Sequence, residues 1–221
     1  MKKIIILFLL FVFALPVNAA SVIIENVKCS EVIEAIKKKY IKTGAAIDNV
    51  TDYSVTVIER GNYPLARLMY SLPVSKQIEL KSVYSFVQDN KDVIINANLL
   101  LIQNPSSAFA LDKPLRDEET QFILNNLKRE LTGYYGYGFD YEMNIKTITI
   151  TDVFKNNGLK KDDKIKKINN KSISGLRYDD VNKLLYPDEI KAVTLLIKPK
   201  KQDVKEITLD AYYIAPLIQK K

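Results

Sequence analysis

Hydrophobic and polar residues alternate with two different periods along the first hundred residues. Apolar residues at helical spacing predict a helix that Ser30 caps and that Thr43-Gly44 ends. Alternating or continuous short apolar runs predict strands. The expected elements are strands at 22–24, 54–58, 83–88 and 93–102 and helices at 30–40 and 63–72. This order predicts a small α+β domain over residues 20–108, and no motif in it indicates its role.

A second amphipathic helix is expected over Asp117–Leu131, within a connecting segment at 109–132. Its acidic first turn and basic last turn suit the two ends of a helix dipole. The apolar stripe consists of Phe122, Ile123, Leu127 and Leu131. Such a stripe favours packing against one domain over binding a separate partner.

The last third of the chain predicts another compact set of strands. Strands are expected at 147–151, 164–168, 193–197 and 206–211, and a helix at 177–185 turns Val181, Leu184 and Leu185 inward. Asn169-Asn170 is typical of a tight turn. The stretch Gly133–Phe139 holds three of the seven glycines, so a loop here can turn several backbone N–H groups toward a carboxylate.

Composition excludes several familiar chemistries. The 221 residues include 33 Lys+Arg, 26 Asp+Glu, one Cys and no His, which gives a net charge of +7. Without His there is no Ser-His-Asp triad, Cys-His pair or HExxH zinc site, and no Asp precedes the Thr-Gly and Ser-Gly pairs of an aspartic protease. A single Cys excludes an internal disulfide. We therefore expect no enzyme activity, metal or cofactor, although a Ser-Lys dyad stays open.

The N-terminus has the layout of a secretory signal peptide. A basic Met1–Lys3 precedes an apolar run of 12 residues at 4–15 and a small-residue cleavage site at Val17-Asn18-Ala19. The apolar run is short against the about 20 residues that span a bilayer. We expect residues 1–19 to be removed and the protein to be exported, periplasmic or secreted; the alternative is an uncleaved anchor.

Four motifs in the last third resemble bacterial PDZ domains. Gly136-Tyr137-Gly138-Phe139 is similar to the GLGF-type carboxylate-binding loop of that family. The segments 158–165 and 168–173 resemble its G-L-x-x-G-D-x-I and I-N-G-x-x-I motifs, and Tyr178–Leu185 takes the place of its groove helix. Asp162 and Asn170 replace two glycines, and both residue types tolerate a positive φ.

The resemblance implies a PDZ-like domain over residues 133–215, a partly open β-barrel with helices. In the family a peptide C-terminus lies between the strand after the loop, here 140–144, and the groove helix. The N–H groups of Tyr137, Gly138 and Phe139 then hold the carboxylate. The implied peptide-binding residues are Gly136, Tyr137, Gly138, Phe139, Tyr141, Tyr178, Val181, Asn182 and Leu185.

Together these patterns predict a non-enzymatic exported adaptor that docks a protein or peptide C-terminus. The alternative is a structural subunit of an envelope or secretion assembly, in which the PDZ-like fold serves only for packing. The tyrosines at 134–141 suit either a recognition surface or a seam between domains. Residues 155–171 hold seven lysines and two acids, which favours a solvated face or attraction to an anionic envelope surface over nucleic acid. The oligomeric state stays open.

Overall fold

The computed structural model describes residues 20–60, 78–105, 107–108, 110–144, 147–200 and 202–218. The expected signal peptide at 1–19 and the expected helix at 63–72 lie outside the described residues. Within the described ranges, no helix has both the length and the apolar character needed to cross a membrane.

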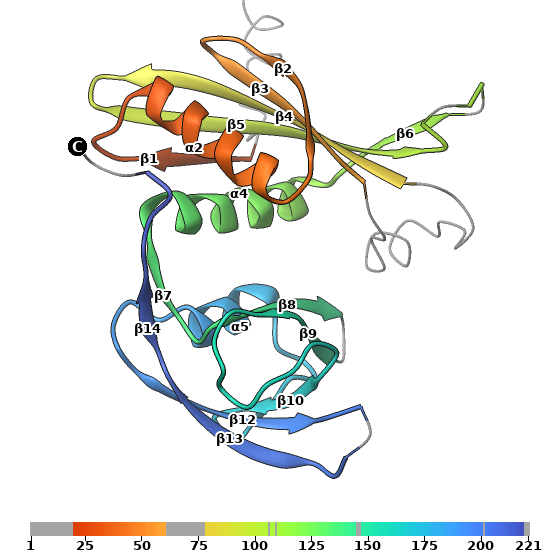
Figure 1. Ribbon diagram of the computed structural model, residues 1–221, viewed down its shortest axis with the longest axis vertical. Coiled ribbons are helices and arrows are strands. Elements are labelled where there is room, and N and C mark those ends of the chain that lie inside the picture. The colour runs from red at the N-terminus through yellow and green to blue at the C-terminus, as the bar shows by residue number, and fades with distance from the viewer. Residues whose placement is uncertain are drawn as a thin grey trace, which may run out of the picture.

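The N-terminal sheet is antiparallel throughout, and helices α2 (Cys29–Lys42) and α4 (Asp117–Thr132) pack against it (Figure 1). Its strands follow the order β1-β5-β4-β3-β2, with β6 paired to β5. The strands are β1 (Ser21–Ile24), β2 (Ala46–Val50), β3 (Ser54–Arg60), β4 (Ile78–Asp89), β5 (Asp92–Gln103) and β6 (Leu111–Pro114). One apolar cluster joins both helices to β1, β3, β4 and β5.

Two of these strands and one helix start differ from the sequence expectation. Strand β2 was missed because most of its side chains are exposed at a sheet edge, so no apolar alternation marks it. Strand β6 was missed because Pro114, at its end, indicated a break, and proline is tolerated in edge strands. Ser30 is not the N-cap, since α2 already begins at Cys29, whose N–H donates to the side chain of Gln88 at 2.9 Å.

Helix α4 packs on the N-terminal sheet, as its stripe indicated, but with a different set of buried residues. Leu127 and Leu131 are buried as expected, together with Thr120 and Leu124. Ile123 contacts a smaller cluster formed by β4 and β5. Phe122 lies instead at the border of a cavity, so it is the one residue of the expected stripe that does not pack on the N-terminal clusters.

The C-terminal sheet is open and not closed into a barrel among the described strands. Its order is β13-β12-β10-β9-β8, with β11 paired to β10, and helix α5 (Tyr178–Leu185) lies beside β8 (Figure 1). The strands are β8 (Phe139–Asn144), β9 (Thr147–Val153), β10 (Lys164–Ile168), β11 (Lys171–Ser172), β12 (Ala192–Lys198) and β13 (Lys205–Asp210). A separate apolar cluster fills this half of the molecule.

The turns of the C-terminal sheet adopt the backbone expected of them. Asp162 has a φ of +72°, and Asn169 and Asn170 have φ of +48° and +63°. The neighbouring Asp163 is buried and its carboxylate accepts a hydrogen bond from the Lys160 N–H at 3.0 Å. The positive φ predicted for Asp162 and Asn170 is therefore confirmed.

A two-stranded ribbon connects the two sheets. Strand β7 (Tyr134–Gly136) leaves α4, and β14 (Tyr212–Ile214) returns beside it in antiparallel register. Beyond β14 the Leu217 N–H donates to the Glu130 carbonyl at 2.9 Å, and Ile218 is buried in the N-terminal cluster. The first and the last residues that the structure describes therefore both lie in the N-terminal half.

Candidate functional site

Strand β8 forms one edge of the C-terminal sheet. Among the described strands it pairs only with β9, so its other edge faces α5 (Figure 1). An exposed strand edge presents backbone N–H and C=O groups that an extended peptide can pair with. The structure thus brings together the strand and the helix that the sequence resemblance placed on either side of a groove.

Hydrogen bonds to two carbonyl groups of the loop before β8 fix the direction of its backbone N–H groups. The Tyr137 carbonyl accepts a hydrogen bond from the Asn157 side chain at 2.9 Å, and the Gly138 carbonyl accepts one from the Phe154 N–H at 2.8 Å. In a trans peptide the N–H points opposite to the carbonyl of the same plane. The N–H groups of Gly138 and Phe139 therefore point away from Phe154 and Asn157. Gly138 has a φ of +80°, which favours glycine at this turn.

Most of the residues expected to bind a peptide are buried. Gly136 and Gly138 are buried in the loop, and the remaining buried members belong to the C-terminal cluster: Tyr137, Phe139, Val181 and Leu185. Val181 is 0% exposed and Phe139 is 6% exposed. Tyr178 is the first residue of α5, and its side chain is outside the described part. These side chains are packed as core.

Tyr141 and Asn182 bridge the space between β8 and α5. The Tyr141 hydroxyl donates to Asn182 Oδ1 at 2.7 Å. The Tyr141 ring also stacks on Tyr186, with ring centroids 6.2 Å apart. Both residues were expected to face the ligand, and in this structure they face each other.

The tyrosines near the loop fall into two sets. Tyr134 meets Tyr186 edge-on at 5.5 Å, and the Arg129 guanidinium of α4 lies 4.0 Å above the Tyr186 ring. Tyr135 instead meets Tyr213, within the ribbon of β7 and β14. The first set forms the seam with α4 and the second stiffens the ribbon, so the seam interpretation fits their contacts.

A cavity of about 430 Å³, here called the cleft, separates α4 and β3 from the edge of β8. The N-terminal half contributes Glu59, Phe122, Asn126, Arg129 and Glu130, and the C-terminal half contributes Tyr134, Asp140, Tyr141, Glu142, Thr151 and Tyr186. Four of these residues are acids and one is a cation. Because Glu59, Glu130 and Asp140 are far apart along the chain, no sequence pattern marked the cleft.

Burial raises the pKa of three carboxyl groups that line the cleft. Burial, and next the charge of Glu130, raise the pKa of Asp140 to about 6. Burial also raises the pKa of Glu59 and of Glu142. Burial of Tyr186 raises its pKa to about 12, against the opposing effect of Arg129. These shifts come mainly from burial, and the charge of Glu130 adds to them at Asp140 and Glu59.

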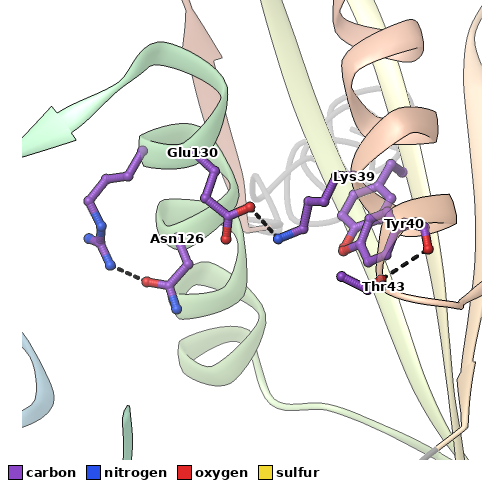
Figure 2. A network of polar contacts seen from close by, with 7 residues as sticks. Lys39, Tyr40, Thr43, Asn126 and Glu130 are labelled. Atoms are coloured by element: carbon purple, nitrogen blue, oxygen red, sulfur yellow. Dashed lines mark hydrogen bonds and ion pairs between the residues drawn. The ribbon is translucent and has the colours of Figure 1, made fainter. Parts of the chain in front are cut away.

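A polar network ties α4 to α2 behind the cleft (Figure 2). The Lys39 ammonium of α2 pairs with the Glu130 carboxylate of α4, and Asn126 accepts a hydrogen bond from Arg129. Tyr40 follows Lys39 in α2, and its hydroxyl pairs with that of Tyr84 at 2.5 Å inside the N-terminal half. The network fixes the acidic wall of the cleft to the N-terminal core.

The described residues contain no group of three or more potential metal ligands. Cys29 is half-buried, and burial raises the pKa of its thiol, which makes the thiolate less available.

Comparisons with known proteins give likenesses among solved structures alone. No family model matches the sequence, and no curated protein matches it. Among solved structures, the chain is similar to the PDZ domain of a carboxy-terminal protease from Vibrio cholerae, determined in complex with a peptide. The identity is 20%, the match covers 37% of this chain and 97% of that chain, and the TM-score is 0.32.

Proposed function

We propose that this protein is a non-enzymatic binding module that holds the C-terminal end of a partner protein as an added strand on β8. The orientation of the Gly138 and Phe139 N–H groups beside an edge strand carries this proposal, since those groups suit a carboxylate. The protein acts after export, as an adaptor in the cell envelope. The lysines of β10 add attraction to an anionic envelope surface.

A library of C-terminal hexapeptides tests this function against purified protein. We expect binding that needs a free carboxylate, so the same library with amidated ends does not bind. Gly138→Asp sets a side chain against Lys155 and Tyr212 and places a negative charge at the loop, so binding is lost. Gly44→Asp is the matched control because Gly44 has a φ of +79° in a turn of the N-terminal half, with open space around it.

A structural subunit of an envelope assembly is the second candidate. It is favoured by the bond between Tyr141 and Asn182, which spans the space that a peptide needs, and by the burial of Phe139 and Leu185. If neither library binds, the groove is closed for packing and this second function holds.

A further inference from the structure

The cleft is acidic from both halves of the molecule. Glu59 of β3 and Glu130 of α4 face Asp140 and Glu142 of β8 across it. Arg129 is the one cation among its lining residues, and its guanidinium is engaged with the Tyr186 ring and with Asn126. The cleft therefore already holds one guanidinium against a tyrosine and keeps an excess of carboxylates.

The register of β8 shows which ligand residue reaches this acidic surface. Tyr141 pairs with Ile150 and Met143 with Ile148, and both isoleucines are fully buried, so these side chains lie on the core face. Asp140 and Glu142 lie on the opposite face and line the cleft, which the Tyr141 ring also borders where it stacks on Tyr186. Side chains of a peptide added to β8 alternate between the same two faces.

In the proposed function the Gly138 and Phe139 N–H groups hold the ligand carboxylate, which puts the last ligand residue level with Phe139 and turns its side chain toward the core face and α5. The residue before it then turns toward Asp140 and Glu142. A cation at that position faces the carboxylates of Asp140 and Glu142 directly, and it also offsets the repulsion between Asp140 and Glu130, which adds to burial in raising the Asp140 pKa.

We propose that the ligand carries a lysine or arginine as its penultimate residue and that this side chain enters the cleft between the two halves. This inference rests on the proposed peptide-binding function. It gives the N-terminal half a part in recognition, because Glu59 and Glu130 form the far wall. The competing explanation is that Asp140 and Glu142 only protect an edge strand from unwanted pairing, a common use of charge at sheet edges.

The probe is the tightest free-carboxylate hexapeptide from the library, made in three versions with arginine, citrulline or glutamate at the penultimate position. Citrulline keeps the shape of arginine without its charge. We expect the arginine version to bind about threefold tighter than citrulline and about tenfold tighter than glutamate at low salt. The ratios shrink toward one in about 0.5 M NaCl because salt screens exposed charges.

Charge-neutral variants locate the interaction. Glu142→Gln, and separately Glu59→Gln, are expected to bring the arginine-to-citrulline ratio close to one while binding of the citrulline peptide is unchanged. Glu206→Gln, on the distant strand β13, is the matched control and leaves the ratio as it was.

Each outcome decides one claim. If peptides bind through their carboxylate but arginine and citrulline bind equally, the cationic preference is wrong, the proposed function stands, and the acids only protect the edge. An arginine preference that persists in both Glu142→Gln and Glu59→Gln also overturns the assignment to the cleft. If no free-carboxylate peptide binds, the proposed function and this inference both fail.

Discussion

The hydroxyl of Tyr141 donates a 2.7 Å hydrogen bond to Asn182 Oδ1 and so joins the edge strand β8 to helix α5. A ligand strand that enters between these elements has to break this bond. Under the proposed function, formation of this bond therefore competes with peptide binding.

Replacing Tyr141 by Phe removes the hydroxyl and keeps a ring that can stack on Tyr186. We expect the free energy of unfolding to fall by about 1 kcal/mol, the usual net contribution of one hydrogen bond. The affinity for a bound peptide rises about fivefold, since the same bond no longer opposes entry. Urea denaturation and fluorescence anisotropy measure the two effects. Tyr53→Phe, at a residue 72% exposed, is the control, and an unchanged affinity for Tyr141→Phe means that the bond does not gate the groove.

A comparison of alanine substitutions at Gly138 and Gly44 separates the cost of backbone strain from the cost of steric crowding. Their φ angles are +80° and +79°, so alanine at either site carries the same left-handed strain of about 1 kcal/mol. At Gly138 the added Cβ also meets Lys155 Cβ at 2.9 Å and the Tyr212 hydroxyl at 3.0 Å, whereas nothing lies within 4 Å at Gly44. Gly138→Ala is therefore expected to lower stability by about 1–3 kcal/mol more than Gly44→Ala. Equal losses in thermal unfolding would show that Lys155 and Tyr212 move aside freely.

Asp140 makes the stability of the protein depend on pH. Its pKa is about 6 in the folded protein, against an ordinary value of 3.8, so the folded state binds the proton more tightly than the unfolded state does. The stabilising contribution of the protonated Asp140 carboxyl is fully present below pH 3.8 and is lost as the pH rises through 6. We expect Asp140→Asn to match the unchanged protein at about pH 3.5 and to exceed it at about pH 7.

The gain at neutral pH is about 1 kcal/mol at most, because the Asp140 carboxyl is partly exposed and solvent screens it. Urea titrations at both pH values measure it. The neighbouring charges of Glu130, Lys39 and Asp152 are unchanged in this variant. A variant that is less stable than the unchanged protein at neutral pH would contradict the assigned direction.

Gln88 holds the start of α2 through both ends of its amide. Its Oε1 accepts from the Cys29 N–H at 2.9 Å, while its Nε2 donates to the carbonyls of Val27 and Asp92 at 3.1 and 3.0 Å. Gln88→Glu keeps the acceptor but sets a carboxylate oxygen against those carbonyls. We expect it to cost about 2–3 kcal/mol, more than the about 1–2 kcal/mol of Gln88→Ala, as chemical denaturation can show. The reverse order would mean that the acceptor alone matters.

The sequence predicts best those elements whose two faces differ. Strand β10 was predicted with its observed bounds, because Ile165 and Ile168 are buried between lysines and a two-Asn turn follows. Strands β7 and β14 are three residues long and pair only with each other, so neither length nor alternation marks them. The candidate site was likewise predicted only in part. The loop and the groove helix came from a family resemblance, whereas the cleft also needs Glu59 of β3, which lies far from α4 and β8 in the sequence.

The burial of Ile218 in the N-terminal cluster makes the C-terminal half an insertion and not a tandem module. A fragment that stops at Thr132 lacks this side chain, and one that starts at Gly133 exposes it. The backbone N–H groups of Leu217 and Ile218 donate to the carbonyls of Glu130 and Leu131 in α4. A force that pulls on the chain after Ile218 therefore acts directly on α4. Fusion of a cargo to the C-terminus therefore loads the same helix that forms the wall of the cleft.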